Sequence, residues 1–291
     1  MKFGFLINKQ KVTGDGFAIA PLEEIDAIIE TFYNTTSVSH GWIYGPEREL
    51  TKSHTEKKKF STRAPITCSS YYSMPPTHQV TTSCDDVELS RFLILGYGFL
   101  NGIYLSPEGN LYLDRVPYEC GKLTGLVLVG KDRQLGMQQI ASFYRGASPQ
   151  DRKLAFSILH WFLLGQTHRY PWEKFDSQYK VLDGVFRLSK LKSSSHAERP
   201  VVLAKEFGVT LPSWAKLITP RSSRLSDIRN ELAHEARFDG EPIGYAHPKE
   251  NFGVEFSSFN IKLICGVLGI KSEYLREKPG CIEYCAWNIA I

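Results

Sequence analysis

Apolar residues recur at helical spacing through the second half of the chain. The first such segment opens with Ser148-Pro149-Gln150-Asp151, which supplies an N-cap residue, a proline at the first helical position and an acid in the first turn. The pattern predicts a helix from there to about residue 167. Its predicted core face consists of Leu154, Ile158, Leu159, Phe162 and Leu163.

Further helices are predicted downstream by the same spacing. They cover about residues 172–190, 197–207, 212–218, 220–236 and 257–269. The apolar stripe of the first of them consists of Phe175, Tyr179, Leu182, Val185 and Phe186. Because short connections favour antiparallel neighbours, this half is predicted to be an up-and-down bundle of four main helices with smaller additions.

The first half has a different pattern, in which short apolar runs are broken by turn residues. Strand-like runs at 102–105 and 111–114 flank a Pro-Glu-Gly-Asn turn, which predicts a hairpin. A further strand is predicted at 123–130 and a helix at 21–32. The predicted fold class is therefore α+β, with a β-rich N-terminal domain at 1–145 followed by an all-α helical bundle at 146–291.

Composition adds few constraints. The chain of 291 residues has a formal net charge of +4. The apolar run at its start is too short for the signal peptide pattern, and no apolar stretch is long enough to predict a membrane span. Its six cysteines form no Cys-x-x-Cys pair, and Cys281 and Cys285 have no companion pair of Cys or His nearby. We therefore expect a cytoplasmic protein with reduced thiols, no metal site and no cofactor.

Positive charge is concentrated between residues 187 and 229. Three acids lie in this stretch, Glu198, Glu206 and Asp227, against nine basic residues. The basic residues are Arg187, Lys190, Lys192, Arg199, Lys205, Lys216, Arg221, Arg224 and Arg229. Such a zone suits a polyanion such as RNA, although a solvated helix surface has the same composition.

The most informative stretch is 226–235, Ser-Asp-Ile-Arg-Asn-Glu-Leu-Ala-His-Glu. On the predicted helix, the apolar residues face the core of the bundle. Arg229, Asn230 and His234 are not needed there and are left for another role. Arg229 and His234 are five residues apart, about 140° of rotation and about 7.5 Å of rise on a regular helix. They can converge on one phosphate if the helix ends or loosens near His234, or if two copies of the helix meet in a dimer.

RNA cleavage without a metal needs these residue types. Attack of a ribose 2′-OH on the adjacent phosphate requires a base near neutral pH and an acid for the leaving oxygen, and histidine serves in both roles. A guanidinium such as that of Arg229 matches the oxygens of the charged phosphorane. The amide of Asn230 can hold the phosphate or orient His234. A symmetric dimer would supply a second histidine.

The sequence Arg229-Asn230-Glu231-Leu232-Ala233-His234 resembles the Arg-polar-x-x-x-His motif of the HEPN superfamily, in the form seen in ApeA-like HEPN proteins. The resemblance covers about residues 147–275 and includes the segment at 169–175. It implies a metal-independent endoribonuclease that acts as a homodimer through the motif helix, with Arg229 and His234 catalytic and Asn230 accessory. It also implies a role in bacterial defence, abortive infection or a toxin–antitoxin pair, with an antitoxin or regulatory protein as a further partner.

Two other interpretations remain open. The helical domain can be a non-catalytic HEPN-like module that binds RNA or protein or forms dimers, or the motif helix can be an ordinary surface helix in a scaffold. The remaining polar residues favour structural roles: His160 at the edge of the core, His196 in an exposed loop, His247 in a turn, and Glu235, Asp239 and Glu241 in a solvated loop. The N-terminal domain, which carries no enzyme signature, is predicted to sense a signal or recognise a target.

Overall fold

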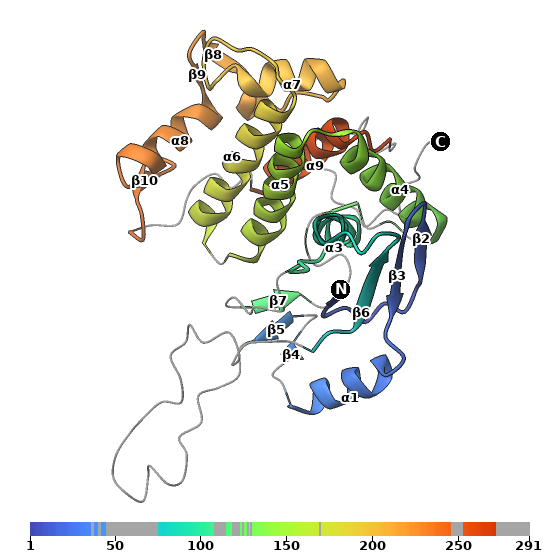
Figure 1. The fold of residues 1–291 in the computed structure, drawn as a ribbon. Helices are drawn as coiled ribbons and strands as arrows, with labels where there is room; N and C mark the ends of the chain where they lie inside the picture. Colours follow the sequence, from blue (N-terminus) through green and yellow to red (C-terminus); the bar gives the residue numbers. More distant parts are fainter. Residues whose placement is uncertain are drawn as a thin grey trace, which may run out of the picture.

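The computed structural model has an α+β fold, as predicted, with small antiparallel sheets and long helices (Figure 1). It describes residues 1–35, 38, 39, 42–44, 75–107, 115–117, 123, 125, 126, 128, 130–168, 170–245 and 253–271. His247, Cys281, Cys285 and the second strand of the predicted hairpin lie outside the described residues.

The main sheet of the first half has four antiparallel strands in the order β1-β6-β3-β2. The strands are β1 (Lys2–Phe3), β2 (Val12–Gly14), β3 (Phe17–Pro21) and β6 (His78–Thr82). The dipeptide Asp15-Gly16 joins β2 to β3, with Gly16 at a φ of 68°, as a two-residue hairpin turn requires. Alternate side chains such as Phe17 and Ile19 are buried, so one face of this sheet packs on the core.

The remaining elements of the first half are helices and a second small sheet. Helix α1 (Ile25–Thr35) corresponds to the helix predicted at 21–32. Strands β4 (Val38–Ser39), β5 (Trp42–Tyr44) and β7 (Arg115–Pro117) form a three-stranded antiparallel sheet. Helices α3 (Val87–Asn101) and α4 (Gly130–Gly146) pack against each other, and α3 lies between the four-stranded sheet and α5 (Figure 1).

Two strands predicted in this half are wrong in the described residues. Residues 102–105 do not form a strand, because Gly102 caps α3 in the left-handed conformation at a φ of 61°. The apolar residues Leu123, Leu126 and Leu128 are buried, but none of them is in a strand. The amides of Leu123 and Leu128 instead donate to carbonyls at the end of α3, at 2.9 and 3.0 Å.

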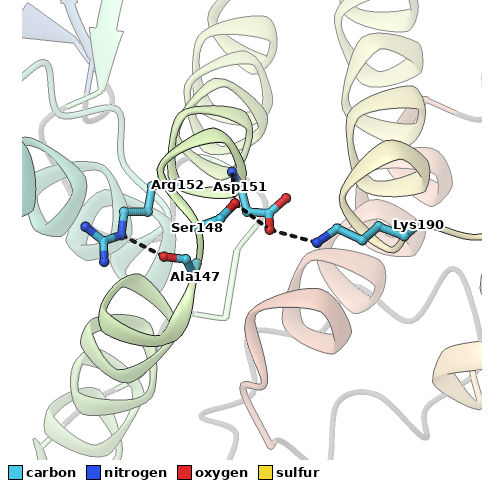
Figure 2. Close-up of polar contacts among 5 residues, drawn as sticks. All are labelled: Ala147, Ser148, Asp151, Arg152 and Lys190. Atoms are coloured by element: carbon cyan, nitrogen blue, oxygen red, sulfur yellow. Dashed lines mark hydrogen bonds and ion pairs between the residues drawn. The ribbon is translucent and has the colours of Figure 1, made fainter.

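The second half is built on the antiparallel pair α5 (Pro149–Thr167) and α6 (Pro171–Leu188). Ser148 caps α5 as predicted, since its hydroxyl accepts from the Asp151 amide at 3.2 Å. Figure 2 shows this cap and the bond at 2.9 Å from Lys190, just beyond α6, to the Asp151 carboxylate. Helices α7 (Arg199–Phe207), α8 (Arg224–His234) and α9 (Gly253–Leu268) complete this half.

Short elements surround α8. A 3₁₀ turn, η2 (Ser213–Ala215), and strand β8 (Leu217–Thr219) stand where a helix was predicted at 212–218, so that prediction is wrong. Strand β8 pairs with β9 (Ser222–Ser223) before α8, and β10 (Arg237–Phe238) pairs with β11 (Glu241–Pro242) after it. The motif helix is therefore held between two hairpins.

One cluster of buried apolar side chains runs through both halves. The rings of Phe99 in α3 and Phe162 in α5 meet edge to face, with their centroids 5.5 Å apart. Helix α9 is tied to α6 by Asn260, whose amide donates to the backbone and side-chain oxygens of Gln178 at 2.9 Å each. Across residue 146, the described part of the core is continuous.

Candidate active site

The start of the motif helix is fixed by a capping box. The Ser223 hydroxyl accepts from the Ser226 amide at 3.1 Å, and the Ser223 amide donates to the Ser226 hydroxyl at 2.8 Å. The sequence predicted a start at residue 220 from Thr219-Pro220, but Pro220 lies in the turn between β8 and β9. The helix therefore begins four residues later than predicted, because proline after threonine also suits a turn.

The helix ends at His234, and the chain then reverses into the β10–β11 hairpin. Ala236 has a φ of 50°, so the backbone leaves the helix directly after the motif. The hairpin is anchored to α8 by the Gly240 amide, which donates to Glu231 at 2.7 Å, and by an ion pair between Arg224 and Asp239. The side chain of Asp239 is 2% exposed, so its predicted place in a solvated loop is wrong.

The structure brings the three predicted site residues together. The Arg229 guanidinium Nη1 lies 3.4 Å from Nε2 of His234 and donates to Oδ1 of Asn230 at 3.1 Å. Arg229 is half-buried, whereas Asn230 and His234 are exposed. We call these three residues the motif triad.

Convergence occurs within a single chain. The long Arg229 side chain spans the rise to His234, and His234 is the last residue of α8, which is the first of the two routes expected from the sequence. A guanidinium has only donors, so Nε2 of His234 accepts in this contact and Nδ1 carries the proton of the neutral ring.

A second group of polar side chains adjoins the motif triad, and the sequence did not single it out as part of a site. It comes from α6, the segment that leads into α7 and the first residue of α7, and we call it the α6–α7 cluster. Its members are Tyr179, Asp183, His196 and Arg199. The Arg229 guanidinium carbon lies 5.9 Å from the centre of the Tyr179 ring, which connects the two groups.

Tyr179 is the buried member of the α6–α7 cluster. Burial, followed by the charge of Asp183, raises the pKa of Tyr179 to about 12, so its hydroxyl stays protonated at neutral pH. That hydroxyl is buried without a hydrogen-bond partner in the part of the chain that the structure describes. A buried donor of this kind is costly unless something bonds to it.

Asp183 organises the rest of the cluster. Arg199 donates to its carboxylate at 2.6 Å, and Nδ1 of His196 lies 4.0 Å from the same oxygen. Burial lowers the pKa of His196, and the positive charges of Arg199 and Arg229 lower it further, while Asp183 opposes them. The His196 side chain is 47% exposed, as the sequence predicted, although its approach to Asp183 was missed.

A sequence signal for the cluster existed. Tyr179 was assigned to the apolar stripe of its helix, and Asp183 follows it at the i,i+4 spacing that places both on one face. Three of the nine basic residues in the predicted polyanion zone form ion pairs within the fold: Lys190 with Asp151, Arg199 with Asp183, and Arg224 with Asp239. Part of the positive charge in that zone is therefore paired with acids within the fold.

Comparison with protein-family models, with curated proteins and with solved structures finds no match to this chain. Across the described ranges, no three His, Cys, Asp or Glu side chains are grouped so that they could hold a metal ion. None of the helices in those ranges is long and apolar enough to cross a membrane. The geometry of the motif triad and its surroundings is therefore the basis for inferring a function.

Proposed function

We propose that this protein is a metal-independent endoribonuclease of HEPN type, with Arg229 and His234 as catalytic residues and Asn230 as the accessory group. The observation that carries the proposal is the 3.4 Å approach of the Arg229 guanidinium to Nε2 of His234 at an accessible helix end. In this proposal residues 146–291 are the helical nuclease domain. Residues 1–145 sense a signal or recognise a target.

The proposed reaction is transesterification at phosphorus. The ribose 2′-oxygen attacks the adjacent phosphate, and its proton passes to an imidazole. The bond from phosphorus to the 5′-oxygen breaks, and that oxygen takes a proton from an acid, which leaves a 2′,3′-cyclic phosphate. Arg229 balances the charge of the phosphorane, and Asn230 binds a phosphate oxygen or orients His234.

Two proton-transfer groups are needed, and each chain has one histidine in the motif triad. A homodimer through α8 supplies the second from the other copy, with RNA bound between them. Exposed apolar side chains on both sides of α8 support this arrangement. They are Leu217 and Ile218 before the helix, and Ile243 and Tyr245 after it.

The resemblance to ApeA-like HEPN proteins supports the biological setting we propose, which is bacterial defence, abortive infection or a toxin–antitoxin pair in the cytoplasm. An antitoxin or regulatory protein is the further partner in that setting. The alternative is a non-catalytic HEPN-like module that binds RNA or protein. The RNA cleavage experiment described next distinguishes the nuclease from the non-catalytic module.

The test uses the full chain and a labelled RNA in buffer that contains a chelator. We expect cleavage to persist in the chelator and to fall about 100-fold or more in Arg229→Ala and in His234→Ala, because each removes a group that acts on the transition state. Arg187→Ala and His168→Asn are matched controls. Arg187 is exposed in the last turn of α6, and His168 occupies the C-cap position of α5.

Cleavage that is equal in the wild type and both motif variants would overturn the nuclease proposal. RNA that is bound but not cut by the wild type, with binding weakened by Arg229→Ala, would support the non-catalytic alternative. Melting temperatures of all variants should match that of the wild type, which separates loss of chemistry from loss of fold.

A further inference from the structure

A cavity of about 400 Å³ lies where the start of α3, the end of α4 and the start of α5 meet. Its walls combine three aromatic rings with three cationic side chains. They are Phe92, Tyr144, Phe156, Arg91, Arg152 and Lys153. The cavity shares none of these residues with the motif triad or the α6–α7 cluster.

The aromatic rings are arranged as supports for the cations. The guanidinium carbon of Arg152 lies 4.4 Å from the centre of the Tyr144 ring, and that of Arg91 lies 5.3 Å from the centre of the Phe156 ring. Phe92 packs beside Tyr144, with their ring centres 5.3 Å apart. Phe92 and Tyr144 are 1% and 6% exposed, so the flat surface that the cavity offers consists of the partly exposed Phe156 ring and the guanidinium planes.

Backbone carbonyls hold the Arg152 guanidinium in place. Its Nε donates to the carbonyl of Ala147 at 3.0 Å, as Figure 2 shows, and Nη2 donates to the carbonyl of Arg145 at 3.3 Å. These acceptors are neutral, so they fix the orientation of the guanidinium without neutralising it. A cation that is ordered before a ligand arrives loses less entropy on binding.

Acidic groups do not cancel the positive charge of the cavity. Among the described residues that line it, Glu88 is the only acid, and it bonds to Arg91 at 3.3 Å. The acid in the first turn of α5, Asp151, points to the other side of that helix, toward Lys190 (Figure 2). Asp86, the N-cap residue of α3, places a second carboxylate near Tyr144, so three cations face two acids. An excess of positive charge remains, and the N-terminal end of α5 adds to it.

We propose that this cavity binds a mononucleotide that carries free phosphates. A nucleobase stacks on the Phe156–Arg91 side of the cavity, and the phosphates bind Arg152 and the exposed Lys153. The volume lies within the range of small-molecule sites, about 300–1,000 Å³. The nucleotide contacts α3 and α4 of the first half and α5 of the second, and the proposal does not depend on the nuclease.

The test is calorimetric titration of the full chain with ATP and GTP, with their nucleosides, and with inorganic tripolyphosphate. We expect at least one nucleotide to bind, and its nucleoside and tripolyphosphate to bind at least about tenfold more weakly, because base and phosphates both contribute. Lys153→Ala and Arg152→Ala should each weaken nucleotide binding about tenfold. The matched control is Lys190→Ala, a cation on the opposite side of α5, which should bind as the wild type does.

Three results would overturn the proposal. They are the absence of binding by both nucleotides, tripolyphosphate binding as tightly as the nucleotides, and unchanged affinity in Lys153→Ala. Lys153 is exposed, so its substitution leaves the fold intact and keeps the test valid if Arg152→Ala proves unstable. The titrations contain no RNA, so their outcome is separate from that of the nuclease experiment.

Discussion

His78 in β6 is buried, and both of its ring nitrogens have polar neighbours. Nε2 donates to the carbonyl of Asn8 at 2.7 Å, and Nδ1 accepts from the Thr77 hydroxyl at 3.0 Å. Burial lowers the pKa of His78 from 6.5 to about 4, against a smaller opposing effect of the Asn8 bond. The ring is therefore neutral in the folded protein at pH values where it is already protonated in the unfolded chain.

This shift predicts that the protein loses stability in mild acid. Between pH 6.5 and about 4 the unfolded state binds more protons at this site, so the free energy of unfolding decreases as the pH falls through that window. We expect a decrease of about 2 kcal/mol from this site between pH 7.5 and pH 5. Urea denaturation at both pH values measures it. A His78→Gln variant should lose most of the difference, and an undiminished difference would contradict the assignment.

At the motif, the sequence selected the residue types and the structure supplied their approach. Arg229, Asn230 and His234 stood out because they were not needed in the core of an amphipathic helix. Their contact depends on where α8 ends and on the side-chain conformation of Arg229, which the linear pattern leaves open. Asp183 and Arg199 were missed because their ion pair joins residues sixteen positions apart on two helices.

At the scale of elements, the long helices of the second half were predicted well, whereas α3 and α4 of the first half were not predicted. The predicted bounds of α5 are confirmed, since Ser148 and Pro149 determine its start by local chemistry. The strand predicted at 102–105 is wrong because Gly102 caps α3 and the apolar residues after it are buried outside any strand, which a short apolar run does not reveal. The start of α8 predicted at Thr219-Pro220 is also wrong, because Pro220 lies in a turn and the helix begins at Arg224.

The packing of α5 on α6 predicts the effect of one small substitution. A Cβ on Gly165 would lie 2.2 Å from Cβ of Ser177 across this helix pair. Gly165→Ala should therefore destabilise the protein by about 1–3 kcal/mol through overpacking, although alanine favours an isolated helix by about 1 kcal/mol. Urea denaturation measures the difference. Gly146→Ala is the control, because its Cβ meets nothing within 4 Å, and a Gly165→Ala variant as stable as the wild type would refute the close approach.

At the scale of the whole molecule, the continuous core predicts how the protein unfolds. Phe99, before residue 146, packs on Phe162, after it, and the buried cluster includes both halves. We expect one cooperative transition, with coincident midpoints for tryptophan fluorescence and far-ultraviolet circular dichroism. Two separate transitions would instead favour independently folding domains with a boundary near residue 146, which remains a prediction.

By itself the sequence determined the α+β class, most helices of the second half and the residues of the motif triad. These depend on local spacing and capping, which act over a few residues. Only the tertiary structure decided that Arg229 meets His234 in one chain, that Tyr179 and Asp183 adjoin them, and that rings and cations enclose a cavity beside α5. Such contacts join residues far apart in the chain, and they form only when separate helices pack together.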